Sequence, residues 1–257
     1  MHYLISCSIV KNEDDYILDF IEYNKFMGIE HFIFYDRSTI PLSETLKGRT
    51  DVTIINFPEP NRHTDAWFEC LKNFQGFSKW CMFFDIDQFI MIHHHNDMKV
   101  LLQGYEKFGA LGINWLTFGD NGHIKKPEGS QFKNFTKRNK LEDGVNVHVQ
   151  SCVQLDRAAI VKPGDPHHFQ MKRGQVTVNE KFIPFDGPFS KPPSGDLINL
   201  AHFYTRSHEE WSNKVLKNRA DTGTAIDNNF FYAANTSCNE VEDFSIYNTY
   251  KKMKGIE

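Results

Sequence analysis

Two aspartates, Asp85 and Asp87, are the residues of this chain best placed to do chemistry. They follow the apolar run 80–84, which predicts a buried strand. Side chains two positions apart on an extended chain point to the same side, so both carboxylates can face one ion while Ile86 packs inward. Carboxylates this close repel each other unless a cation lies between them, and their oxygens suit Mg²⁺ or Mn²⁺. The pattern predicts a metal site; a capped turn after a strand is the structural alternative.

The first hundred residues alternate strand and helix patterns at the spacing of a parallel α/β sheet. Apolar runs predict strands at 3–10, 31–35, 52–57 and 80–84, and apolar periodicity predicts helices at 16–27, 43–46 and 64–74. Ligands of an open parallel sheet bind outside the carboxyl ends of its strands. We therefore expect Lys11, Asn12, Glu13 and Asp36 to lie at the same edge as the aspartate pair.

The rest of the chain is less regular. Strands are expected at 110–116, 145–155, 158–161 and 197–204, and a helix at 207–219 with Ser207 as its N-cap and Glu210 at the third helical position. Residues 162–193 carry six of the ten prolines, which indicates loop-rich chain around a second substrate. Since no repeat or clean linker interrupts the sequence, we expect residues 1–257 to form a single α/β domain.

Composition and charge exclude several classes of protein. With 40% hydrophobic and 24% charged residues the chain can build a core, and a net charge of −4 gives no basic field for nucleic acid. No apolar stretch is long enough for a transmembrane helix, and no leader peptide is evident. Five cysteines without a C-x-x-C pair argue for buried thiols in a reducing compartment. The lack of a membrane anchor suggests the cytoplasm, in a bacterial or viral setting more than a Golgi one.

Several segments in order resemble one family. They are SIVKNE (8–13), HFIFYD (31–36), WCMFFDIDQF (80–89), INWLTFGDNGH (113–123), IVKP (160–163) with the pair at 167–168, and NLAHFYTRSHEEWSNK (199–214). Together they resemble inverting glycosyltransferases of the GT-A fold, most closely glycosyltransferase family 92 and its family-2-like relatives. The resemblance implies a Rossmann-like, mostly parallel sheet flanked by helices, with residues 1–100 as the nucleotide-binding half and 101–257 as the loop-rich acceptor half and C-terminal helix.

The resemblance also implies a donor site. It makes Asp85, Asp87 and His202 the ligands of Mn²⁺ or Mg²⁺, which bridges the diphosphate of a nucleotide sugar. Lys11, Asn12, Glu13 and Asp36 would hold the base and ribose, and carboxylates suit this because they accept hydrogen bonds from hydroxyl groups. Lys214 and Arg219 on the last predicted helix can reach the diphosphate, with a solvated helix face as the alternative.

The acceptor side is less well defined. The resemblance assigns Trp115, His123, His167 and His168 to it, and the acceptor is a glycan or glycoconjugate. Inversion needs a general base that removes the proton of the acceptor hydroxyl. The candidates are Asp120, Asp227 and Asp186, in that order, with role-free loop carboxylates as the alternative.

The chain departs from the family pattern at two places. Gln88 stands where Glu is usual, which removes a charge beside the metal site, and Asp120 and Asn121 replace small serines. The histidine run 93–95 follows a strand and is interpreted as a solvated turn, because three consecutive side chains cannot all face one ion.

A metal-dependent glycosyltransferase is the leading hypothesis. A nucleotidyltransferase would need a Gly-rich phosphate loop with a lysine, and none follows Val10. A metal-dependent phosphohydrolase would need a second ligand cluster. A non-catalytic carbohydrate-binding protein with a structural metal is the alternative from another class.

Overall fold

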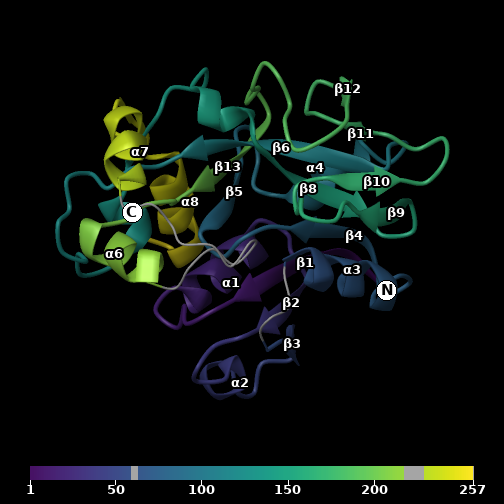
Figure 1. Ribbon diagram of the computed structural model, residues 1–257, viewed down its shortest axis with the longest axis horizontal. Helices are drawn as coiled ribbons and strands as arrows, with labels where there is room; N and C mark the ends of the chain where they lie inside the picture. The colour runs from purple at the N-terminus through teal and green to yellow at the C-terminus, as the bar shows by residue number, and fades with distance from the viewer. Residues whose placement is uncertain (59–62, 217–228, 257) are drawn as a thin grey trace.

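The computed structural model of the chain has a large central sheet flanked by helices (Figure 1). It describes residues 1–58, 63–216 and 229–256, without the side chains of residues 230, 233 and 234. The strands are β1 (His2–Val10), β2 (His31–Asp36), β3 (Val52–Asn56), β4 (Ser78–Phe83), β5 (Gln88–Ile92), β6 (Ala110–Thr117), β7 (Lys137–Arg138), β8 (Val149–Gln154), β9 (Ala158–Val161), β10 (Phe169–Met171), β11 (Thr177–Val178), β12 (Pro184–Phe185), β13 (Ile198–His202) and β14 (Val241–Glu242). The helices are α1 (Ile17–Phe26), α2 (Leu42–Thr45), α3 (His63–Asn73), α4 (Met98–Gln103), α5 (Gln131–Asn134), the 3-10 helix η1 (Gly144–Val147), α6 (His208–Leu216), α7 (Phe230–Cys238) and α8 (Ser245–Lys254).

The sheet has the strand order β12-β11-β6-β8-β4-β1-β2-β3, and β13 and β5 join it through β6. Strands β1 to β4 run parallel to one another where they pair, while β8 is antiparallel to both β4 and β6. The predicted α/β class is confirmed. Because β1, β2 and β4 are parallel, their carboxyl ends share one edge of the sheet, as expected for a ligand site.

Strand β2 shows why the sheet needs cover on both faces. Phe32 and Phe34 pack into the cluster that includes α1, whereas Ile33 and Tyr35 pack into the cluster that includes α3. All four side chains are fully buried. Alternate residues of a strand point to opposite faces, so a continuous apolar run is what a sheet between two helical layers requires.

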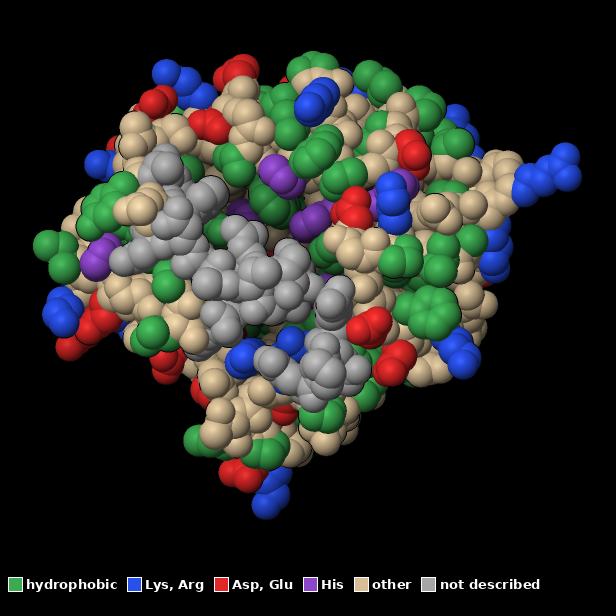
Figure 2. Space-filling model, viewed as in Figure 1, with side chains coloured by type: hydrophobic (Ala, Val, Ile, Leu, Met, Phe, Trp, Pro, Cys, Tyr) green, Lys and Arg blue, Asp and Glu red, His purple; other side chains and the backbone are tan. Residues whose placement is uncertain are grey.

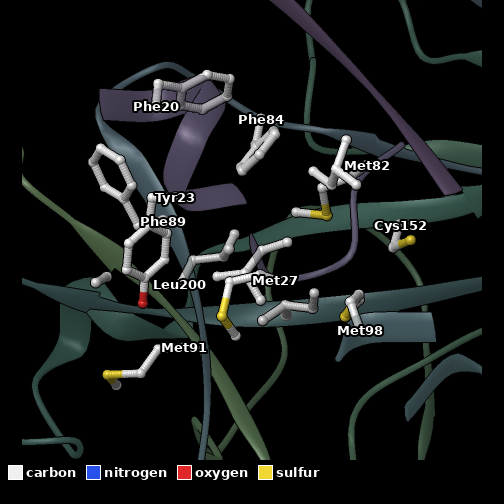
Figure 3. Close-up of a cluster of buried hydrophobic side chains, with 14 of the residues drawn as sticks. Phe20, Tyr23, Met27, Met82, Phe84, Phe89, Met91, Met98, Cys152 and Leu200 are labelled. Carbon is white, nitrogen blue, oxygen red and sulfur yellow. The ribbon is translucent and has the colours of Figure 1, made fainter. Parts of the chain in front are cut away.

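The larger core cluster is centred on aromatic rings between α1 and the sheet. Phe20 of α1 lies 5.0 Å from Phe84 and 6.1 Å from Phe89, measured between ring centroids. Figure 3 shows the side chains of Phe20 and Phe84 near each other in this cluster. Many phenylalanines of this chain therefore serve to fill the buried core.

Strand β13 carries the second half of the chain back to the edge where β4 ends. It pairs antiparallel with β5, so that His202 is opposite Gln88, and it pairs parallel with β6. The backbone N–H of Phe203 donates to the carbonyl of Asp87 at 2.9 Å. This register fixes the end of β13 beside the aspartate pair.

Most predicted elements of the first hundred residues occur within a few residues of their expected bounds. The helix expected at 207–219 begins with the predicted capping box: Ser207 and Glu210 exchange hydrogen bonds between side chain and backbone. Residues 217–219 lie outside the described residues. The stretch 162–193, expected to be irregular, contains the short strands β10, β11 and β12. Helix α8 was not predicted from the sequence.

The structure also shows where the cysteines and the histidine run lie. All five cysteines are free and buried. The histidine run 93–95 is an exposed turn, where His93 Nε2 lies 3.1 Å from Asn199 Oδ1. Across the described ranges, no helix combines the length and apolar character needed to cross a bilayer.

We expect Phe20→Ala to lower the free energy of unfolding by about 3–5 kcal/mol, because it removes a fully buried ring and leaves a cavity. Urea unfolding followed by circular dichroism measures the loss. Leu18→Ala is the control on the same helix, since Leu18 is 48% exposed and should change stability by less than about 1 kcal/mol. Equal losses in the two variants would contradict this description of the core.

Stability should also fall as the pH drops below about 6.5, the pKa of an unfolded-state histidine. Burial, aided by the nearby His2, lowers the pKa of His31 in the fold. The unfolded chain therefore binds a proton more readily than the folded one below that pH, which favours unfolding. Urea unfolding at pH 7.5 and 5.5 should show a smaller change in the free energy of unfolding in His31→Gln than in the parent chain. An equal change in the two proteins would contradict a contribution of His31 to the pH dependence.

Candidate active site

The segment between β4 and β5 holds Asp85 and Asp87 in a turn built by its own residues. The backbone N–H of Asp85 donates to Gln88 Oε1 at 3.0 Å, and Gln88 is fully buried. Ile86 is 5% exposed, so it packs inward as expected. Gln88 thus shapes the turn as a hydrogen-bond acceptor, a function that does not require the negative charge of the family's usual Glu.

The two carboxylates have different surroundings. Asp85 is 36% exposed, and its Oδ1 lies 3.2 Å from His63 Nε2. Asp87 is 14% exposed; its Oδ2 accepts a hydrogen bond from Lys214 Nζ at 2.9 Å, and its Oδ1 lies 3.4 Å from His202 Nε2. Burial alone would raise the pKa of Asp87, but Lys214 and His202 outweigh it and hold the pKa well below the usual range. Asp87 is therefore an anion in the folded protein.

The side chains at this site carry ligand atoms that suit a hard divalent cation. Asp85, Asp87 and His202 offer carboxylate oxygen and imidazole nitrogen, which fit Mn²⁺ or Mg²⁺. Asp87 Oδ1 is a buried atom for which the described structure provides no hydrogen bond, and this open acceptor could receive a cation. Within the described part of the chain, no group of three His, Cys, Asp or Glu side chains is arranged so that it could hold a metal ion. The residues fit by chemistry, while Lys214 and His63 occupy part of their coordination space.

An arginine that sequence reasoning missed connects β13 to the end of β1. Arg206 is 8% exposed, and its Nη1 lies 3.1 Å from Glu13 Oε2. Its guanidinium lies 3.7 Å from the centre of the Tyr16 ring, a cation–π contact. Tyr16 in turn donates a hydrogen bond to Glu210 of α6. Glu13 is thus tied to the start of α6 by a buried charged network.

A pocket lies between these elements. It is lined by Glu13, Tyr16, Asp87, Arg206 and Lys214, among others. Figure 2 shows several histidine side chains close together on one face of the molecule. The pocket opens at the shared carboxyl edge of β1 and β4, where ligands of such sheets bind.

The other residues predicted for the first strand ends have mainly structural contacts. Asp36 Oδ1 accepts from Ser38 N, and its Oδ2 accepts from Leu42 N. Asn12 adopts a positive φ of 54° and accepts from the backbone N–H of Thr39. Lys11 lies in the same turn. These contacts join the loops after β1 and β2 at the edge of the pocket.

The residues predicted for the acceptor side divide into two groups. Trp115 lies edge-on to His167 at 5.6 Å and to His202 at 4.5 Å, and it stacks on His148 at 4.8 Å. Burial lowers the pKa of His167, while the charge of Asp85 acts in the opposite direction. These rings therefore border the aspartate pair. His63 and His148 were not predicted as site residues, because the sequence gives no local pattern for either.

The second group lies in loops with contacts of their own. His168 Nε2 lies 2.7 Å from Asp186 Oδ1, and Asp186 is 90% exposed. His123 Nε2 lies 3.1 Å from the carbonyl of Asn134. Asp120 Oδ1 accepts hydrogen bonds from Gly122 N and Asn239 Nδ2. Two further predicted positions, Asp227 and Arg219, lie outside the described residues.

Comparison with known proteins identifies relatives by sequence. Residues 2–183 match the family described as Glycosyltransferase family 92. A glycosyltransferase family 92 protein of Oryza sativa subsp. japonica is 23% identical over 186 residues, covering 69% of this chain and 31% of that protein. One of Arabidopsis thaliana is 21% identical over 194 residues, covering 67% and 32%. This chain thus spans about a third of the length of these curated relatives. Both are plant proteins, which lends no support to the expected bacterial or viral setting.

Structural likeness is weaker. A UDP-glucose pyrophosphorylase complexed with UDP-glucose aligns over 85% of this chain and all of that chain, at 12% identity and a TM-score of 0.35. A 4-diphosphocytidyl-2C-methyl-D-erythritol synthase from Anaerococcus prevotii aligns over 60% and 72%, at 12% identity and a TM-score of 0.34. These scores are too low to carry an argument.

The two aspartates should contribute differently to stability. Asp87→Asn leaves Lys214 without its counter-charge, and we expect it to cost about 1–3 kcal/mol of unfolding free energy. Asp85→Asn affects a more exposed pair and should cost less than about 1 kcal/mol. Urea unfolding at pH 7.5 without added metal measures both; a larger loss for Asp85→Asn would contradict the geometry.

Proposed function

Because the chain belongs to glycosyltransferase family 92, we propose that it transfers a sugar from a nucleotide-diphosphate sugar to a hydroxyl group of a glycan or glycoconjugate. We further propose that the reaction is metal-dependent and inverts the anomeric carbon. The observation that carries the proposal is the convergence of Asp85, Asp87, His202 and Lys214 at the carboxyl edge of the sheet.

The donor is proposed to lie between the end of β1 and the start of α6. Asp85, Asp87 and His202 would hold Mn²⁺ or Mg²⁺, which neutralises charge on the leaving diphosphate. Arg206 and Lys214 add positive charge to the lining of the pocket. The turn at 11–13 and the loop after Asp36 are adjacent surfaces for the base and ribose, supported by their mutual hydrogen bonds.

The acceptor is proposed to approach from the side of the imidazole rings. Trp115, His148 and His167 give an aromatic surface next to Asp85, and aromatic faces suit the apolar faces of sugars. His123 and His168 remain acceptor-side candidates from the resemblance.

A carboxylate is proposed to take the proton of the attacking hydroxyl. Asp120, Asp186 and Asp227 are the candidates, and we place Asp186 first among the two described. Its carboxylate is exposed and contacts His168, next to His167, whereas Asp120 is held by Gly122 and Asn239 within its loop. Asp186→Asn should lower kcat more than it raises KM if this choice is right.

Donor turnover tests the transferase function directly. Purified protein is incubated with Mn²⁺ and a panel of nucleotide sugars, and release of nucleoside diphosphate is measured with and without candidate acceptors. We expect release from at least one donor. Asp85→Asn should lower kcat/KM about 100-fold or more, because it removes a ligand that acts on developing charge.

The control is Glu106→Gln, which removes an ion pair with Lys79 outside the pocket and should leave turnover unchanged. Absence of release from every donor, together with absence of Mn²⁺-dependent nucleotide binding, would overturn the transferase function. Nucleotide binding without turnover would favour a binding protein. Release of pyrophosphate from a nucleoside triphosphate and a sugar 1-phosphate would instead indicate a nucleotidyltransferase, and cleavage of the nucleotide sugar to a nucleoside monophosphate and a sugar phosphate would indicate a phosphohydrolase.

A further inference from the structure

Lys214 already contacts the carboxylate that a metal at this site would need. Its Nζ donates to Asp87 Oδ2 at 2.9 Å and to the backbone carbonyl of Tyr204 at 3.0 Å. The ammonium also lies 4.4 Å from the centre of the Tyr204 ring. Although the side chain as a whole is 34% exposed, its charged end is directed inward and held at three points.

The other oxygen of Asp87 has weaker contacts. Oδ1 is buried, and it accepts no hydrogen bond from the described residues although His202 Nε2 is 3.4 Å away. A buried carboxylate oxygen without a donor raises the free energy of the folded state. Asp87 therefore has one oxygen engaged by Lys214 and one available for a second cation.

Charge balance limits how many cations can remain there. Arg206 is a further buried positive charge in this pocket, and it acts against the positive charge of Lys214. A divalent cation on Asp87 would add two more positive charges beside both residues, and like charges this close repel each other. The oxygens of a diphosphate are strong acceptors for an ammonium group, so a bound diphosphate gives Lys214 a second anionic partner besides Asp87.

We propose that Lys214 is an internal counter-ion of Asp87 that competes with the metal and moves to the diphosphate when the nucleotide binds. This inference rests on the proposed function, because it assumes a metal and a diphosphate in the same pocket. In the nucleotide-free protein, Lys214 weakens metal binding at Asp87. Once the diphosphate accepts Lys214, that competition ends, so binding of either ligand favours the other.

The proposal differs from two simpler functions of Lys214. A lysine that only bound phosphate would leave the metal affinity of the nucleotide-free protein unchanged when removed. A lysine that only stabilised the turn would, on removal, loosen Asp87 and weaken metal binding. A competing lysine gives the opposite sign: its removal tightens metal binding.

Mn²⁺ binding to metal-stripped, nucleotide-free protein is the decisive measurement, made by calorimetry and by the electron paramagnetic resonance signal of free Mn²⁺. We expect Lys214→Met to bind Mn²⁺ about tenfold more tightly than the parent chain. Lys214→Arg keeps the positive charge and should resemble the parent. Lys79→Met is the matched control, because Lys79 pairs with Glu106 and does not line the pocket.

The second half of the proposal is tested with inorganic pyrophosphate in the presence of EDTA. Lys214→Met should bind pyrophosphate about tenfold more weakly than the parent chain. Lys79→Met should again behave like the parent. Lys214→Gln is used in both experiments if circular dichroism shows that Lys214→Met does not fold.

Equal or weaker Mn²⁺ affinity in Lys214→Met, or no Mn²⁺ binding to either protein, would overturn the competition. Unchanged pyrophosphate affinity, or no pyrophosphate binding to the parent, would overturn the transfer to diphosphate. These outcomes are separable from those of the donor assay. Turnover with unchanged Mn²⁺ affinity would reject this inference alone, while tighter Mn²⁺ binding without turnover of any donor would reject the transferase function alone.

Discussion

The antiparallel pairing of β13 with β5 is the constraint on which the candidate site depends. Its register places His202 opposite Gln88, and one residue later Phe203 bonds to the backbone of Asp87. The chain then turns through Arg206 into α6. A site that begins with two acids at residues 85 and 87 is thereby completed by groups more than a hundred residues away. Slipping this register by one residue would turn the His202 side chain to the other face of the sheet.

The buried charges of the pocket depend on one another. Asp87 is stabilised by Lys214, Glu13 by Arg206, and Arg206 also by the ring of Tyr16. Each of these contacts joins the first half of the chain to the segment after β13. The lining of the pocket therefore combines residues of the first hundred with residues that follow β13.

How much of this was predictable depends on whether the determining contacts are local. Continuous apolar runs correctly indicate the parallel strands, and the Ser207 and Glu210 spacing correctly indicates the start of α6, because both signals lie within a few residues. Arg206 sits in a short turn with a positive φ of 51°, where no periodicity applies. Its importance comes from Glu13 and Tyr16, which are distant in sequence.

Lys214 illustrates the same limit at the scale of one helix. On sequence alone, Lys214 can either reach the diphosphate or lie on a solvated face of a charged helix. In the fold it follows the fully buried Trp211 by three residues and the capping Glu210 by four, and residues at these spacings share a helix face. The cap that starts α6 and the indole that anchors it therefore also determine which way Lys214 points. Because Lys214 shares this face of the helix, its ammonium contacts Asp87. The two alternatives that the sequence leaves open for Lys214 are thus separated by contacts that are distant in sequence.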